Sequence, residues 1–234
     1  MRKNWFDGTK SYWYSIRIIE NGDRRVEEGR EIMKKYKTKE EIELLFGKLN
    51  LRHIINNESI YPELKNYDLR ASSYYIDNYD EFIHLEKEYG KQLTSHYQAP
   101  LYVKNADDGI GYGLFSDKPM KEGDLIGQYT GIVQEAFHFD PEDKETAAKT
   151  EYAWDYPDEI PGLPPLEINA RYAGGVLRFV NHSFQPNLRI EHTVVDNEWK
   201  IFFVADENIE TDAELFVDYG DDYWSADFRE VIIP

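Results

Sequence analysis

Hydrophobic residues in the first hundred positions recur mostly at the three- and four-residue spacing of an amphipathic helix. Three segments with this spacing are predicted helices: 26–36, 40–55 and 80–97. Thr38 followed by Glu41 has the capping-box pattern that begins the second helix. The exception is SYWYSIRII (11–19), which is aromatic and β-branched, precedes an Asn-Gly turn signal, and is predicted to be a strand. Residues 1–98 are therefore predicted to be a mostly helical region.

After Ala99-Pro100 the pattern changes to short apolar runs separated by glycine, which is typical of strands. Six such runs are predicted strands: 101–104, 113–116, 124–133, 175–180, 201–205 and 214–219. An acidic, proline-bearing segment (137–165) interrupts them, and long loops of this kind in a compact domain are often functional. The pattern predicts an α+β fold with a boundary near residue 98 and a mainly β part after it.

The amino-acid composition limits the kinds of domain and of reactive site that the chain can form. The chain has 234 residues, 41% of them hydrophobic and 15% aromatic, which is enough for a packed core and for one large or two small domains. It has no cysteine, which excludes disulfides and thiolate zinc sites. No apolar run reaches the length of a signal peptide or a membrane span, so a soluble protein is expected.

The net charge of −18 lies entirely in the second part of the chain. Residues 1–98 hold 17 of the 27 Lys and Arg and 17 of the 45 Asp and Glu, so residues 99–234 hold 10 basic and 28 acidic side chains. This distribution argues against a nucleic-acid binder, which needs a basic face, and is compatible with a basic partner. An equal alternative to a basic partner is that the acidic residues only keep the protein soluble.

Four segments after residue 98 carry polar or glycine-rich patterns: GIGYGLF (109–115), QYTG (128–131), ARYAGGVLRFVNHSFQPN (170–187) and ELFVDYGDDYW (214–224). Each alone is weak. The glycines are not followed by the Lys-Ser/Thr of a phosphate loop. A lone histidine such as His182 is usually a structural hydrogen-bonder, and no set of side chains has metal-ligand spacing.

Together and in this order, over roughly residues 100–224, the four segments resemble the SET-domain protein lysine methyltransferases, closest to the histone-methylating branch. The resemblance implies a mainly β SET domain (99–224) with short strands, small sheets and knot-like C-terminal threading. It implies methyl transfer from S-adenosylmethionine to a lysine of a basic protein, without a metal. The first substrate that it suggests is a histone or histone-like tail.

The resemblance also assigns roles to residues of this chain. The expected cofactor-binding residues are Gly111, Tyr112, Gly113, Tyr152, Arg178, Asn181, His182 and Trp224. Arg178 is expected to hold the cofactor's carboxylate, and Asn181 with His182 its amino acid and adenine parts. Trp224, or its neighbour Tyr223, is expected to stack on the adenine.

Tyr219 and Tyr129 are the expected catalytic residues. Methyl transfer needs a neutral amine, whereas a lysine with a pKa near 10.4 is mostly charged at neutral pH. An apolar channel and the nearby sulfonium cation both lower that pKa, so no strong base is needed. Tyrosine rings would wall such a channel, and their hydroxyls would orient the amine. Alignment of this kind can supply roughly 7–11 kcal/mol.

Substrate contacts are expected at Asp155, Asp158 and Val217. The two aspartates belong to the acidic insert and would flank a basic peptide. Val217 stands two residues before the expected catalytic tyrosine, where relatives often have Phe or Tyr that limits the number of methyls. The smaller side chain predicts that two or three methyl groups fit.

The chain departs from many relatives because it lacks a cysteine-rich zinc segment after the SET core. Residues 225–234 would have to close the site differently, through Phe228 or through a homodimer. Asn169 and Phe184 stand where relatives often have Asp and Cys. Neither change alters the chemistry in an obvious way.

Two alternative functions stay open. The domain could be a catalytically weak SET-like module that binds a basic protein, or its substrate could be a non-histone protein such as a ribosomal one. A cytoplasmic or nuclear location is expected, including a host nucleus for a bacterial or viral protein. Residues 1–98 could recognise substrate, dimerise or brace the SET core.

Overall fold

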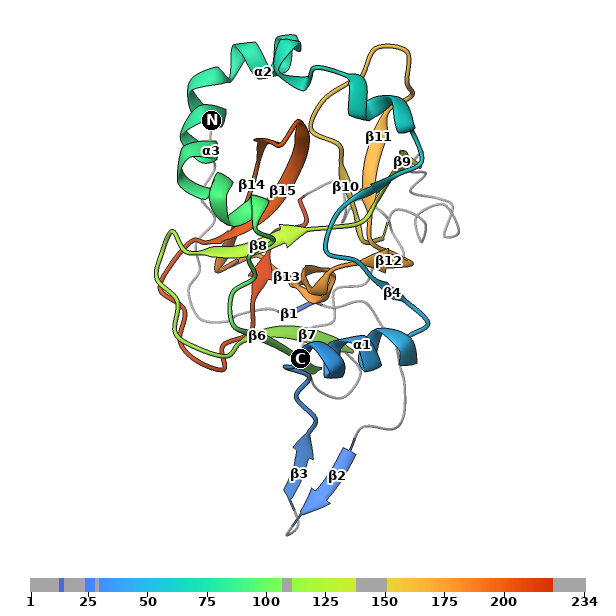
Figure 1. Cartoon of the computed structure of the whole chain (residues 1–234). Helices are drawn as coiled ribbons and strands as arrows, with labels where there is room; N and C mark the ends of the chain where they lie inside the picture. Colours follow the sequence, from blue (N-terminus) through green and yellow to red (C-terminus); the bar gives the residue numbers. More distant parts are fainter. Residues whose placement is uncertain (1–12, 15–23, 28–29, 107–110, 138–150, 221–234) are drawn as a thin grey trace.

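The computed structural model describes residues 13–14, 24–27, 30–106, 111–137 and 151–220. Short strands in small sheets dominate it, and the predicted α+β fold, mainly β after residue 98, is confirmed (Figure 1). The helices are α1 (Lys39–Lys48), α2 (Ser73–Asp77), α3 (Tyr79–Thr94) and the 3-10 turns η1 (Pro62–Asn66), η2 (Leu69–Ala71) and η3 (Val176–Phe179). The strands are β1 (Trp13–Tyr14), β2 (Arg24–Glu27), β3 (Arg30–Met33), β4 (Arg52–His53), β5 (Glu58–Ser59), β6 (Leu101–Asn105), β7 (Tyr112–Ser116), β8 (Leu125–Tyr129), β9 (Ile132–Glu135), β10 (Ala153–Asp155), β11 (Leu166–Asn169), β12 (Ala173–Gly174), β13 (Asn181–Ser183), β14 (Leu188–Val195), β15 (Glu198–Ala205) and β16 (Phe216–Val217).

The capping box predicted for α1 is confirmed. The Glu41 backbone N–H donates to Thr38 Oγ1 over 3.2 Å, and the Thr38 backbone N–H donates to the Glu41 carboxylate over 3.0 Å. The helix ends at Lys48, however, so the prediction of a helix to residue 55 was wrong. Asn50 takes a φ of 53°, and this left-handed conformation ends helices. The chain then enters β4.

The predicted helix 26–36 was also wrong, because this segment contributes to two antiparallel strands. β2 and β3 pair with Glu27 opposite Arg30, which leaves only the Glu-Gly pair 28–29 between them. Two-residue connections with a glycine favour hairpins, and a mid-segment glycine disfavours a helix. The predicted strand 11–19 is seen as the two residues of β1, and 15–19 lie outside the described residues. The helix predicted at 80–97 is confirmed as α3.

Residues before the predicted boundary supply strands to sheets formed by residues after it. β1 pairs with β13, β4 pairs in parallel with β12, and β5 pairs in parallel with β9. The described residues of the N-terminal part therefore form α1, α2, α3, the turns η1 and η2 and short strands, and they are joined to the later sheets through backbone hydrogen bonds.

Helix α3 lies against the sheet β14-β15-β8 (Figure 1). Phe82 of α3 packs edge-on against Trp199 of β15, with ring centroids 5.1 Å apart. Thr193 Oγ1 donates to the Phe82 carbonyl over 3.0 Å. Tyr74 on α2 shares a 2.8 Å hydrogen bond with His192 Nε2 on β14. This aromatic and polar contact fixes one face of the β14–β15 hairpin.

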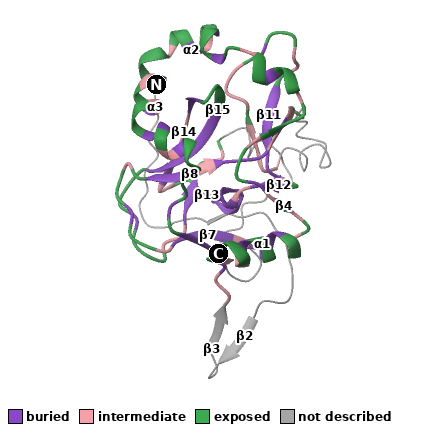
Figure 2. Ribbon diagram, in the orientation of Figure 1, coloured by how far each residue is buried: buried purple, intermediate pink, exposed green. Residues whose placement is uncertain are grey.

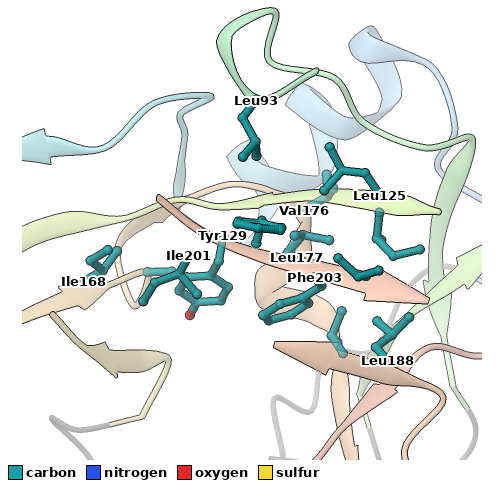
Figure 3. Close-up of a cluster of buried hydrophobic side chains, with 14 of the residues drawn as sticks. Leu93, Leu125, Tyr129, Ile168, Val176, Leu177, Leu188, Ile201 and Phe203 are labelled. Carbon is teal, nitrogen blue, oxygen red and sulfur yellow. The ribbon is translucent and has the colours of Figure 1, made fainter. Parts of the chain in front are cut away.

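Most residues of the same sheet are buried (Figure 2). Tyr129, Ile201 and Phe203 lie beside Leu125 and Leu188 in this core (Figure 3). The segment 175–180, predicted as a strand, instead forms the 3-10 turn η3, whose four residues are all buried. A short buried apolar run looks the same in a strand and in a buried turn, which explains the error. Within the described residues, no helix is long and apolar enough to cross a membrane.

Candidate active site

The site is built on two short strands from distant parts of the sequence. β13 and β16 pair in parallel, with Asn181 opposite Phe216 and His182 opposite Val217. They come from two of the motifs that the sequence singled out, N-H-S and E-L-x-x-D-Y. Strand pairing therefore brings the expected cofactor and catalytic segments into contact.

Asn187 holds this strand pair together. Its side-chain Nδ2 donates to the Glu214 carbonyl over 2.8 Å, and its Oδ1 accepts from the Phe216 N–H over 2.9 Å. One amide thus bonds the backbone on both sides of Leu215 and fixes the entry to β16. Sequence reasoning did not single out Asn187, the last residue of the segment ARYAGGVLRFVNHSFQPN.

His182 positions Tyr219. The histidine side chain is fully buried, and its Nδ1 accepts a 3.0 Å hydrogen bond from the Tyr219 backbone N–H. Burial lowers the pKa of His182, and the carboxylate of Asp218 only partly opposes this effect. A neutral ring whose Nδ1 is an acceptor carries its proton on Nε2.

Asn181 is fixed by Glu214, a residue to which sequence reasoning gave no role. Asn181 Nδ2 donates to Glu214 Oε1 over 2.8 Å. A Cβ added at Gly113 would overlap the same carboxylate, so this glycine allows Glu214 to approach β7. Gly111 takes a φ of 93°, which favours glycine, and Tyr112 begins β7 between them. The sequence did carry a signal for Glu214, because it is the first residue of the E-L-x-x-D-Y motif.

The two expected catalytic tyrosines contact the same indole ring. The centroid of Trp154 on β10 lies 6.2 Å from the Tyr129 ring and 6.4 Å from the Tyr219 ring, edge-on to both. The Tyr129 hydroxyl donates to the Tyr152 carbonyl over 2.6 Å, and the Tyr219 hydroxyl donates to the Val180 carbonyl over 2.7 Å. Sequence reasoning missed Trp154, although it lies two residues after the expected cofactor residue Tyr152.

Arg178 lies buried beside these rings. Its guanidinium carbon is 4.3 Å from the centroid of the Tyr152 ring, and its Nε donates to the Ala170 carbonyl over 3.0 Å. Among the described residues, its buried Nη1 has no hydrogen-bond partner. Tyr152 takes a φ of 63°, an unusual conformation for a residue with a side chain. Burial lowers the pKa of Arg178, and the nearby phenols of Tyr152 and Tyr129 oppose this.

Burial raises the pKa of Tyr129 well above its ordinary value, and the positive charge of Arg178 only partly offsets the effect. The Tyr129 phenol is therefore protonated at neutral pH, and it acts as a hydrogen-bonding group and not as a base.

The expected substrate residues lie in different surroundings. Asp155 is exposed on β10, the outer strand of the sheet β10-β11-β9-β5. Asp158 is half-buried, with Oδ2 enclosed and without a partner among the described residues. Val217 is buried beside His182.

The expectations for Tyr223, Trp224 and Phe228 lie outside the described residues. In the part of the chain that the structure describes, no group of His, Asp and Glu could hold a metal.

Comparison with known proteins relates this site to a family. Residues 111–220 match the family described as SET domain. The chain is 28% identical over 134 residues to "Histone-lysine N-methyltransferase EZH2" of Chaetomium thermophilum, which covers 54% of this chain and 8% of that protein. It is 36% identical over 129 residues to "Histone-lysine N-methyltransferase, H3 lysine-9 specific SUVH1" of Nicotiana tabacum, which covers 51% of this chain and 18% of that protein.

These matches span less than a fifth of either relative. Among solved structures, the chain is similar to the Neurospora SET domain protein DIM-5, a histone lysine methyltransferase, with 25% identity, 56% coverage of each chain and a TM-score of 0.47.

The role of Asn187 in holding the strand pair can be tested through stability. Asn187→Ala leaves two part-buried backbone groups without their partner, and we expect the free energy of unfolding in urea to fall by about 2 kcal/mol. Asn187→Asp retains the acceptor for the Phe216 N–H and should lose less. The control is Gln185→Ala, an exposed side chain in the same turn, which should stay within about 0.5 kcal/mol of the parent. Equal stability of the two alanine variants would contradict this role.

Proposed function

We propose that the protein is a lysine N-methyltransferase that transfers methyl groups from S-adenosylmethionine to a basic protein. The first candidate substrate is a histone or histone-like tail. The observation that carries the proposal is the contact of the N-H-S and E-L-x-x-D-Y strands, together with the contact of Tyr219 with Trp154, the ring that also contacts Tyr129. The curated relatives named above support the reaction class.

The residues present fit the cofactor that this reaction needs. Arg178 has a buried Nη1 that no described residue engages, which suits a carboxylate. Asn181 and His182 are held in fixed orientations on one strand. We propose that these residues hold the amino acid and adenine parts, with Tyr152 and the backbone of 111–113 beside them. When bound, S-adenosylmethionine supplies a methyl group activated by a sulfonium.

The two phenols would orient the incoming amine. Each hydroxyl proton is donated to a backbone carbonyl, which fixes the oxygen and directs its acceptor sites toward other donors. An amine N–H can donate to these oxygens, which aligns the nitrogen lone pair for in-line attack. The edge-on indole of Trp154 would form an apolar wall between the two tyrosines.

The same surroundings would keep the substrate lysine neutral. An apolar wall disfavours the charged ammonium, because burial penalises the charged form. The lysine pKa falls from its ordinary value near 10.4, and water carries the proton away before attack. The protonated Tyr129 is no base, so orientation and dehydration would supply the acceleration.

A second candidate function is a SET-like module that binds a basic protein without turnover, and a third is methylation of a non-histone protein such as a ribosomal one. The tyrosine pair and its fixed hydroxyls favour turnover over binding alone. The acidic excess after residue 98 favours a basic substrate without choosing among such proteins.

Replacing Tyr219 by Phe removes one oriented hydroxyl and keeps the ring. With labelled S-adenosylmethionine and core histones, we expect methyl transfer by the parent and a drop of about 100-fold in kcat for Tyr219→Phe. Affinity for S-adenosylhomocysteine, measured by calorimetry, should stay within about twofold. The matched control is Tyr172→Phe at an exposed tyrosine, which should retain full activity. A parent that binds both the cofactor product and histones without transfer would favour the binding module.

Val217 is proposed to leave room for two or three methyl groups. Mass spectrometry of the peptide product should show these states for the parent, and Val217→Phe should shift the product to one methyl. Because a larger core side chain can cost 1–3 kcal/mol, Val217→Ile serves as the control for overpacking. A parent product that stops at one methyl would overturn the proposal.

Asp155 is proposed to attract the basic peptide, because it is exposed on β10 next to Trp154. Asp155→Lys should raise KM for a histone-tail peptide several-fold and leave kcat unchanged, and the effect should shrink as salt rises. The matched control is Asp206→Lys at an exposed position after β15. An unchanged KM would indicate that the acidic residues of this region serve solubility and not substrate binding.

A further inference from the structure

Phe184 is a large aromatic residue left at the surface directly beside the proposed cofactor strand. It follows β13, and 54% of its surface is exposed. Its ring centroid lies 4.7 Å from that of the buried His182, at an interplanar angle of 89°. A large apolar side chain is therefore more than half exposed directly after the strand that is proposed to hold the cofactor.

The position of Phe184 is fixed from both sides. Ser183 before it is buried, and its Oγ accepts a 3.0 Å hydrogen bond from the Gln185 N–H, which closes a tight turn around Phe184. Ser183 also pairs with Trp13 of β1, and Asn187 bonds the backbone beyond the turn. A ring on so constrained a backbone is preorganised to cover a ligand at low entropic cost.

The chemistry of this neighbourhood suits a purine. Adenine is planar, apolar on its faces and polar along its edges. Stacking between a base and an aromatic side chain is worth about 1–3 kcal/mol. The chain has no cysteine, so a thiolate-bound metal cannot organise the cover over this end of the site.

We propose that Phe184 packs on the adenine ring of the bound cofactor and positions the nucleoside end of that ligand. This inference rests on the proposed function, because it assumes that the strand Asn181–Ser183 holds S-adenosylmethionine. It assigns to Phe184 the packing on adenine that sequence reasoning expected of Trp224 or Tyr223.

The test is calorimetric binding of S-adenosylhomocysteine to the full chain. Phe184→Ala should weaken binding about tenfold, which corresponds to the lower part of the stacking range. Phe184→Trp retains an aromatic face and should stay within about twofold of the parent. Phe184→Leu retains apolar bulk without a ring and should resemble the alanine variant. Tyr79→Ala removes another exposed aromatic, 52% exposed at the start of α3, and should bind like the parent.

A readout specific to contact is the fluorescence of Phe184→Trp. S-adenosylhomocysteine should quench this variant more than the parent, because an added indole lies on the purine. Parent-like affinity of Phe184→Ala or Phe184→Leu, or no added quenching, would overturn the inference and leave the proposed function intact. A parent that does not bind S-adenosylhomocysteine would overturn the proposed function, and the inference with it.

Discussion

The parallel contact between β13 and β16 is the interaction on which the rest of the site depends. Each strand has only two or three residues, so neither is stable alone. Asn187 supplies the missing constraint, because one half-buried amide satisfies a backbone donor and a backbone acceptor at the entry to β16. His182 then extends the contact by accepting the Tyr219 N–H. Polar side chains, more than strand length, fix the distance between the proposed cofactor strand and Tyr219.

The surrounding structure holds this contact in place. The sheet β14-β15-β8 brings Tyr129 to the site, and α3 packs against the β14 side of that sheet. Strands from before residue 98 pair with β9, β12 and β13, so the N-terminal part contributes to the same sheets as the site. This arrangement fits the bracing role among the alternatives raised from the sequence, and it makes the N-terminal part a determinant of site geometry.

Electrostatics within the site favour neutral groups around one buried cation. The guanidinium of Arg178 lies among phenols, and burial keeps the Tyr129 phenol protonated. Burial of a substrate lysine among these rings would likewise favour its neutral form, which is the condition that a lysine nucleophile needs. The proposed methyl transfer therefore needs no strong base.

Local signals in the sequence predicted local features well. Thr38 and Glu41 predicted the start of α1, and the order of four motifs predicted the SET domain. The errors came where tertiary structure decides. A glycine in 26–36 marks a hairpin, and the buried run 175–180 forms a turn because the core surrounds it on all sides. Asn187, Glu214 and Trp154 were missed for a related reason: their roles exist only once strands far apart in sequence meet.

The most direct test of the central claim is a crystal structure of the chain with S-adenosylhomocysteine and a lysine peptide. The account predicts the ligand's amino acid end at Asn181 and Arg178, with its sulfur and the lysine nitrogen meeting between Tyr129 and Tyr219. A ligand bound elsewhere, or a lysine nitrogen that approaches neither tyrosine, would contradict it.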